Sequence, residues 1–231
     1  MNRKITIGFL LLVFTSSAFS QEGFEGRPIT DNVWMPTGYT LNKGEFKIGL
    51  GSIGFGISDN VQAGTNILLF LFQVSNVNLK ISAIKTPTQA LGVGIDFAHF
   101  DLDIFGEEVD ASFTSISPFV AYSTQAGEKT MIHLAGRLST FSGDAEIDDA
   151  KAEESSTGTS VFAGVEHSYS NRTKFLGEVG YDITFEGLRL GGAVLFGWTK
   201  FRLKMGVSYF NPDGPGDFTL PVIGLWWRFK G

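Results

Sequence analysis

Apolar and polar residues alternate with a period of two along most of this chain. Between positions 174 and 185, Phe175 and Val179 share one parity, whereas Glu178 and Asp182 share the other. Successive side chains of a β-strand point to opposite faces, so the alternation predicts a strand whose two faces meet different surroundings. Three later segments repeat the pattern, at 188–198, 201–209 and 223–229.

Seven earlier segments show the same alternation, and no helical period competes with it after the first twenty residues. These segments are 45–57, 61–72, 76–86, 90–102, 112–124, 130–142 and 158–170. Several are separated by short polar turns, and longer loops are predicted at 103–111, 143–157 and 211–217. Strands joined in this order predict an all-β, antiparallel up-and-down meander.

A sheet with one apolar and one polar face forms either a soluble sandwich or a membrane barrel. The strands of about 10 to 12 residues have the length that a tilted strand needs to cross hydrocarbon. If strand directions alternate backwards from the last strand, the aromatic residues gather at two levels. One level holds Tyr122, Tyr169, Phe175, Trp198, Phe201, Trp227 and Phe229, and the other holds Tyr181, Phe185, Tyr209, Phe210 and Phe218. Two aromatic girdles are typical of a transmembrane β-barrel, which we therefore predict.

The strand number follows from a parity argument. Bacterial single-chain barrels have an even number of strands, and the pattern above supplies eleven. The segment Val33–Leu41 alternates as well, although Pro36 removes one ladder hydrogen bond there. We predict twelve strands with 33–41 as the first, and ten strands if the N-terminal pair lies outside the wall.

The first twenty residues predict export. Arg3 and Lys4 precede an apolar run, and Ala18-Phe19-Ser20 supplies small residues for a signal peptidase. We expect a signal peptide at 1–20 and a single barrel domain at 21–231. The net charge of −6 gives no electrostatic case for binding nucleic acid, and the absence of cysteine excludes disulfides.

The last strand carries a motif with a known counterpart. The stretch Gly224-Leu225-Trp226-Trp227-Arg228-Phe229 resembles the C-terminal targeting signal of bacterial outer-membrane β-barrel proteins. In that pattern a glycine, two residues and an aromatic are followed by one residue and a final aromatic, here Gly224, Trp227 and Phe229. Lys230 and Gly231 follow the final aromatic. The resemblance implies an outer-membrane location, insertion by the barrel-insertion machinery, and contact with membrane lipid and lipopolysaccharide.

Charged residues of both signs occupy the inward positions of the last four strands. The set is Glu178, Asp182, Arg189, Arg202, Lys204 and Arg228. Opposite charges on neighbouring strands can pair, so one interpretation is an ion-pair network that fills the lumen of a structural barrel. The alternative is a charged constriction that steers small solutes in a porin-like barrel.

A second inward set is apolar. It comprises Leu68, Phe70, Phe72, Phe113 and Phe119, and it begins where the run Ile67–Phe72 breaks the alternation. The break indicates either a bulge or strand end that packs against a loop, or an apolar pocket for a hydrophobic ligand. The second interpretation makes the protein a hydrophobic-ligand transport or binding barrel.

The predicted outer loops are acidic, mainly at 101–110 and 144–154. Neither stretch has the spacing of a calcium loop with its central glycine, so solvated loops are favoured and no metal or cofactor is expected. Acidic loops also suit a surface-adhesion or structural barrel. The three histidines, His99, His133 and His167, lie in no recognisable catalytic motif, and we do not expect an enzyme.

Overall fold

The structure is a computed structural model that describes residues 29–49, 52–104, 109–147, 150–184, 186–198, 201–211 and 216–228. The predicted signal peptide at 1–20 lies outside these residues. The same holds for Phe185, for Phe229 at the end of the targeting motif, and for parts of both acidic stretches.

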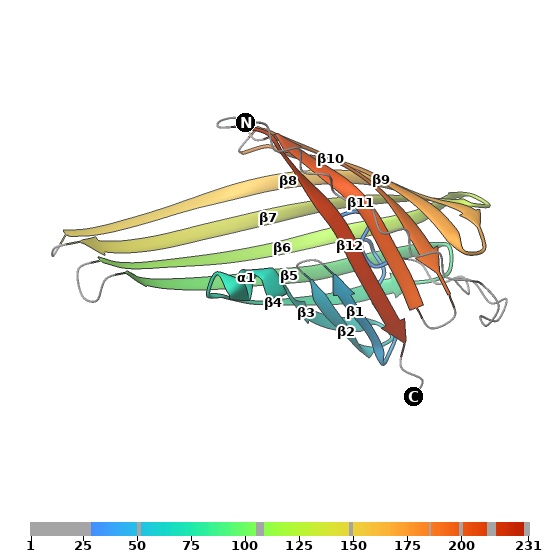
Figure 1. Ribbon diagram of the computed structural model, residues 1–231, viewed down its shortest axis with the longest axis horizontal. Helices are drawn as coiled ribbons and strands as arrows, with labels where there is room; N and C mark the ends of the chain where they lie inside the picture. Colours follow the sequence, from blue (N-terminus) through green and yellow to red (C-terminus); the bar gives the residue numbers. More distant parts are fainter. Residues whose placement is uncertain are drawn as a thin grey trace, which may run out of the picture.

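Twelve antiparallel strands form a closed barrel in which each strand pairs with its neighbours in sequence (Figure 1). The barrel closes where β1 pairs with β12, with Glu45 opposite Arg228. The strands are β1 (Glu45–Gly49), β2 (Ile53–Ser58), β3 (Val61–Thr65), β4 (Val74–Lys85), β5 (Gln89–Ile104), β6 (Val109–Gly127), β7 (Thr130–Ile147), β8 (Ala150–Ser170), β9 (Thr173–Asp182), β10 (Gly187–Gly197), β11 (Phe201–Asn211) and β12 (Phe218–Arg228). This confirms the predicted fold class and strand number.

The outer surface of the barrel is apolar. Outward-facing Leu134 and Val207 are exposed, while their chain neighbours His133 and Ser208 are buried on the inner side. Aromatic rings contact each other at the ends of neighbouring strands. The ring centroids are 5.6 Å apart for Phe201 and Trp227, 5.6 Å for Trp198 and Phe201, and 5.7 Å for Tyr169 and Phe175. An apolar exterior bordered by aromatic rings suits a bilayer as solvent.

The prediction of Val33–Leu41 as the first strand is wrong. That segment lies inside the barrel, and the first two strands arise instead from the predicted single strand 45–57. The chain reverses between Gly49 and Ser52, whose backbone groups bond each other at 2.6 and 3.3 Å. The outward apolar parity changes across this turn, from even-numbered Phe46 to odd-numbered Phe55.

The predicted strand 61–72 is also too long. Strand β3 ends at Thr65, and Ile67–Leu71 form a short helix, α1. The Oδ1 atom of Asn76 accepts the N–H of Asn66 at 2.5 Å and holds the start of this helix against β4. The described part of the chain contains no helix that is long and apolar enough to cross a membrane.

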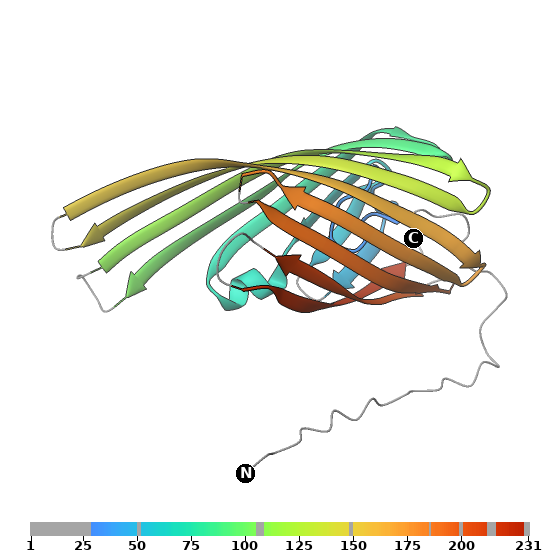
Figure 2. The same cartoon turned by 90° about the horizontal axis from the view of Figure 1, so that it is seen from above.

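Two predicted outer loops are largely strand. Strands β6 and β8 have 19 and 21 residues, against 10 or 11 in β9 to β12, and β9 accompanies β8 only as far as the Ser160–Asp182 pair. The ends of β5 to β8 therefore project beyond the rest of the barrel as a curved sheet (Figures 1 and 2). We call residues 98–104, 109–115, 139–147 and 150–160 the crest. Its outward residues, such as Thr140, Ser142 and Thr157, are polar, so the crest extends past the apolar band.

The crest predicts the orientation of the barrel. An epitope tag inserted in the chain between the end of β7 at Ile147 and the start of β8 at Ala150 should be labelled by antibody on intact cells. The same tag between Glu128 and Lys129, in a tight turn at the opposite end, should be labelled only after the outer membrane is permeabilised. Equal labelling of both tags on intact cells would contradict the orientation.

Candidate functional site

The N-terminal segment Ile29–Asn42, which we call the plug, lies in the lumen (the blue trace inside the barrel in Figure 2). Most of its apolar side chains are almost completely buried, with Ile29, Tyr39 and Leu41 each 1% exposed, and Trp34 is half-buried. The first part turns back on itself, because Thr37 donates its N–H to the carbonyl of Thr30 at 3.0 Å. The plug thus fills the inside of the barrel without joining the sheet.

Glu178 of β9 makes the most concentrated contact with the plug. Its Oε2 atom accepts the backbone N–H groups of Val33, Trp34 and Met35 at 2.9, 2.8 and 2.9 Å. Consecutive amides that converge on one carboxylate form an anion-binding nest, and hydrogen bonds to an ionised acceptor are among the strongest in proteins. Next to it, the Asn32 side-chain amide donates to the carbonyl of Gly177 at 2.8 Å.

Lysines from other strands of the wall bind the backbone carbonyl groups of the plug. Lys204 of β11 donates to the carbonyls of Asn32 and Val33 at 2.7 and 3.0 Å. Lys80 of β4 donates to the carbonyl of Thr30 at 2.7 Å. All of these groups are buried, so each contact replaces hydration that the lumen no longer supplies.

Asp31 is the charged anchor of the plug itself, and it forms an ion pair with Lys47 of β1. Burial alone raises the pKa of Asp31, but Lys47, Lys204 and Lys80 outweigh burial and bring this pKa to about 2. Because the pKa lies below its ordinary value, the contribution of Asp31 to docking is present above pH 4 and is lost as the pH falls towards 2.

A buried polar cluster holds the second half of the plug. Ser123 of β6 accepts the N–H of Gly38 at 2.8 Å, and its hydroxyl also contacts His133 Nδ1 at 2.8 Å. His133 Nε2 lies 3.4 Å from Glu166, which forms an ion pair with Lys174. Near the plug's end, the Gln62 side chain accepts the N–H of Leu41 at 2.9 Å.

Inward-facing glycines provide the space for the plug. A Cβ on Gly164 would lie 2.1 Å from Asn32 Nδ2, and one on Gly191 would lie 2.8 Å from Val33 Cγ1. On the plug side, a Cβ on Gly38 would meet the carbonyl oxygen of Ala90 at 2.3 Å. A side chain at any of these three glycines would collide with the opposite segment, so the glycines let the backbones of the plug and the wall lie close together.

The structure places the predicted lumenal charges as follows. Glu178 and Lys204 both contact the plug, and Lys204 also lies 5.3 Å from the Trp226 ring. Arg189 lies over an aromatic ring, 5.2 Å from Phe210. Asp182 accepts a hydrogen bond from Ser160 at 2.7 Å and Arg202 is buried, while the side chain of Arg228 lies outside the described residues.

The predicted apolar set is not gathered around one cavity. Phe70 and Phe72 are exposed at and after α1, and Phe113 stacks on Phe141 of the crest with ring centroids 5.9 Å apart. Phe119 is buried below Arg137, whose guanidinium lies 5.7 Å from the ring. The side chain of Leu68 lies outside the described residues.

Two residues of the targeting motif lie in the described part of β12. In β12, Trp227 faces outward against Phe201, while Gly224 faces inward beside Trp226.

In the described ranges, no group of three or more His, Asp or Glu side chains is arranged to hold a metal ion.

No protein-family model and no curated protein sequence match this chain. The fold is similar to solved barrels, among them "KdgM porin in complex with disordered oligogalacturonate" (10% identity, 80% of this chain and 97% of that one, TM-score 0.39). Ail, the attachment invasion locus protein of Yersinia pestis, is 12% identical over 81% of this chain and 99% of that one, with a TM-score of 0.36. LpxR from Salmonella typhimurium is 8% identical over 67% and 88%, with a TM-score of 0.34.

Removing the Glu178 carboxylate should loosen the plug. The chain has no cysteine, so Val33→Cys places one thiol in the plug, where the native side chain is 2% exposed. Adding Glu178→Ala leaves three amides without their acceptor, at a cost of about 1–3 kcal/mol for each buried donor. The rate of thiol labelling by a polar maleimide should then rise about tenfold or more, since about 1.4 kcal/mol corresponds to a factor of ten.

The matched control for this experiment is Glu128→Ala, which removes a carboxylate from an exposed turn and should leave the labelling rate unchanged. A cysteine at exposed Lys43 should react rapidly in every background. Equal labelling of Val33→Cys with and without Glu178 would show that this carboxylate does not hold the plug.

Proposed function

We propose that the protein is a porin-like barrel of the bacterial outer membrane whose lumen is closed at rest by its own N-terminal plug. The observation that carries this proposal is the use of the lumenal charges. Glu178, Lys204 and Lys80 bind the plug backbone, and so they are not free to line an aqueous channel. Solute passage through such a barrel requires the plug to move.

The outer-membrane location is supported by three features of the chain. The exterior is apolar, aromatic rings meet at the strand ends, and the C-terminal residues resemble a targeting signal for outer-membrane proteins. Membrane lipid and lipopolysaccharide are the partners that this surface would meet, and insertion would use the barrel-insertion machinery. The signal at 1–20 would deliver the chain to that machinery.

Closure is supported by the distribution of contacts around the wall. The plug bonds to β1 through Lys47, to β3 through Gln62 and to β4 through Lys80, and on the other side to β6 through Ser123 and to β9 through Glu178. A segment tied to strands on all sides blocks the lumen at its own level. Between the plug and the wall there is a cavity of about 150 Å³, which has room for several waters.

Conductance tests the proposal. Purified wild-type barrels in planar bilayers should show no stable open channel, because the plug spans the lumen. Deleting residues 30–41 removes the plug side chains together with the backbone groups that Glu178, Lys204 and Lys80 bind, and should produce stable channels. Heat-modifiable gel migration of both proteins controls for folding. Equal conductance of the two folded proteins, whether high or absent, would contradict a plugged channel.

A second candidate function is contact with an external surface, which the crest favours. The crest projects past the apolar band and carries polar residues outward, so it would be the part of the barrel furthest from the membrane (Figure 1). In this function the barrel is a rigid support, and the lumen stays closed.

Trimming the crest separates the two functions. Thr140 and Thr157 are register partners, so replacing residues 141–156 by Asn-Gly joins β7 and β8 in a tight hairpin. If the crest serves adhesion, cells that make the trimmed barrel should lose attachment to surfaces while the closed lumen is unchanged. Unchanged attachment, with the trimmed protein present at the surface at wild-type level, would dismiss the adhesion function.

A further inference from the structure

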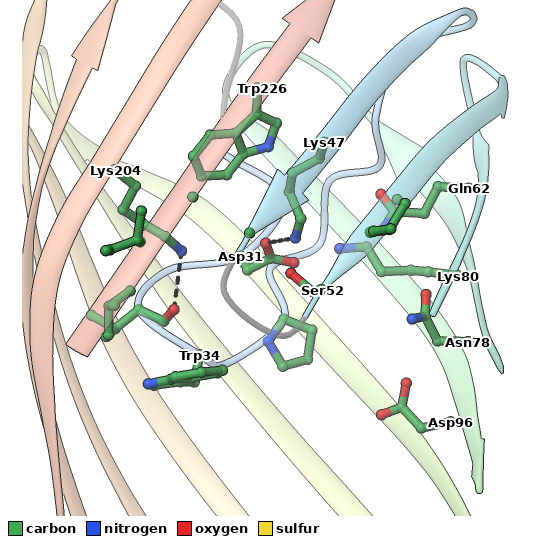
Figure 3. Close-up of a pocket in the computed structure, with 18 of the residues that line it drawn as sticks. Asp31, Trp34, Lys47, Ser52, Gln62, Asn78, Lys80, Asp96, Lys204 and Trp226 are labelled. Carbon is green, nitrogen blue, oxygen red and sulfur yellow. Dashed lines mark hydrogen bonds and ion pairs between the residues drawn. The ribbon is translucent and has the colours of Figure 1, made fainter. Parts of the chain in front are cut away.

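The cavity of about 150 Å³ lies between the plug and the barrel wall (Figure 3). The plug contributes Trp34 and Pro36 to its lining, and the wall contributes Trp226 and Phe119. Its charged lining consists of Asp31, Lys47, Lys80, Asp96, Arg137 and Lys204. A space of this size holds several waters or one small polyatomic solute.

The charges around the cavity do not balance, because four cationic side chains face two carboxylates. Lys47 pairs with Asp31, and Arg137 pairs with Asp96 at 2.8 Å. Lys80 and Lys204 donate to backbone carbonyls, which are dipoles without net charge. A protonated buried lysine that lacks a counter-charge is costly, so with Lys80 and Lys204 protonated the cavity favours an anion.

Glu178 also interacts electrostatically with Lys204, but it does not line the cavity, and its Oε2 atom already accepts three plug amides. It lowers the electrostatic potential at Lys204 but supplies no group to the space itself. The surplus of positive charge is therefore greatest near Lys80, whose ammonium group lies on the same side of Asp31 as that of Lys47 in Figure 3.

Unused hydrogen-bond donors accompany this surplus. An ammonium group has three N–H donors. Among the described residues, Lys80 and Lys47 each use one donor and Lys204 uses two. Arg137 Nε is buried and has no hydrogen-bond partner in the described part of the chain. Ammonium and guanidinium donors are the groups that bind oxyanions most strongly.

We propose that this cavity binds one small oxyanion, of the size of phosphate, sulfate or acetate. The side chains of Asp96 and Arg137 are 37% and 30% exposed, so the anion would enter past this pair. The plug forms one wall of the site, and a ligand that needs this wall stabilises the plugged state by mass action. The proposal rests on the plug of the proposed function, but binding is measured without reference to conductance.

Calorimetric titration of the full-length protein in detergent tests the site directly. Sodium phosphate, sulfate and acetate are titrated separately at constant ionic strength, and at least one should show a single saturable site. Lys80→Met should weaken binding at least tenfold, because it removes an uncompensated cation. Asp96→Asn should tighten binding severalfold, because it removes a repelling carboxylate and releases Arg137.

The control is Lys129→Met, which removes a lysine from an exposed turn and should leave affinity unchanged. Heat-modifiable migration selects folded protein for every titration. Absence of saturable binding in the wild type, or wild-type affinity in Lys80→Met, would overturn the proposal. Weaker binding in both Lys80→Met and Asp96→Asn would overturn it too, since charge would then not decide recognition.

The two proposals fail separately. Saturable anion binding together with an open wild-type channel would contradict the closed lumen and leave the anion site intact. A closed wild-type lumen without anion binding would contradict only the anion site. The anion that binds should also slow maleimide labelling of Val33→Cys, a position that lines the cavity, and this effect should disappear when Lys80→Met is added.

Discussion

The carboxylate of Glu178 is the contact on which the arrangement of the lumen depends. Three consecutive amides of the plug converge on one of its oxygens, in a place where the plug has no sheet or helix to satisfy them. Buried amides without acceptors are strongly unfavourable, so this one side chain decides whether the plug backbone can lie inside the barrel. Lys204 and Lys80 satisfy the carbonyls of the same short stretch. The wall thus recognises the plug mainly through its backbone.

This arrangement changes what the polar inner face means for function. A mixed-charge inner face is compatible with a water-filled channel, yet here it is a binding surface for the chain's own N-terminal segment. Gly164 and Gly191 let the plug backbone lie close to the wall. The buried pair of His133 and Glu166 lies next to the second half of the plug. A plug bound by discrete polar contacts can be released when those contacts are exchanged. A ligand that neutralises the remaining cations would oppose such release.

The sequence was sufficient to predict the fold class and the positions of β4 to β12, but not the first hairpin, the full length of β5 to β8 or the contents of the lumen. Period-two alternation predicted the transmembrane strands, because one side of every strand meets lipid and the other does not. The same alternation in 33–41 comes from an extended segment buried on both sides, which the pattern alone does not distinguish from a strand. Pro36 and the parity change between Phe46 and Phe55 were the available signals that this segment and the first hairpin had been misassigned.

The site residues were predictable only in part, for a similar reason. Glu178 and Lys204 were identified as inward-facing charges, but pairing across neighbouring strands was the only partner that sequence proximity suggested. Their actual partners lie more than a hundred residues away along the chain. The crest was missed because its serines, threonines and acidic residues resemble a solvated loop, whereas the register shows that they pair in long hairpins.

A disulfide across the plug and the wall tests the central claim most directly. The chain is free of cysteine, and a Cβ on Gly191 would lie 3.0 Å from Val33 Cβ. This is about 0.5 Å inside the shortest Cβ–Cβ separation of ordinary disulfides, so a small backbone shift brings the two cysteines into bonding geometry. If the plug lies in the lumen as described, the Val33→Cys/Gly191→Cys double variant should cross-link nearly completely on mild oxidation of the folded barrel. A folded double variant whose two thiols stay free under the same conditions would contradict the plugged lumen.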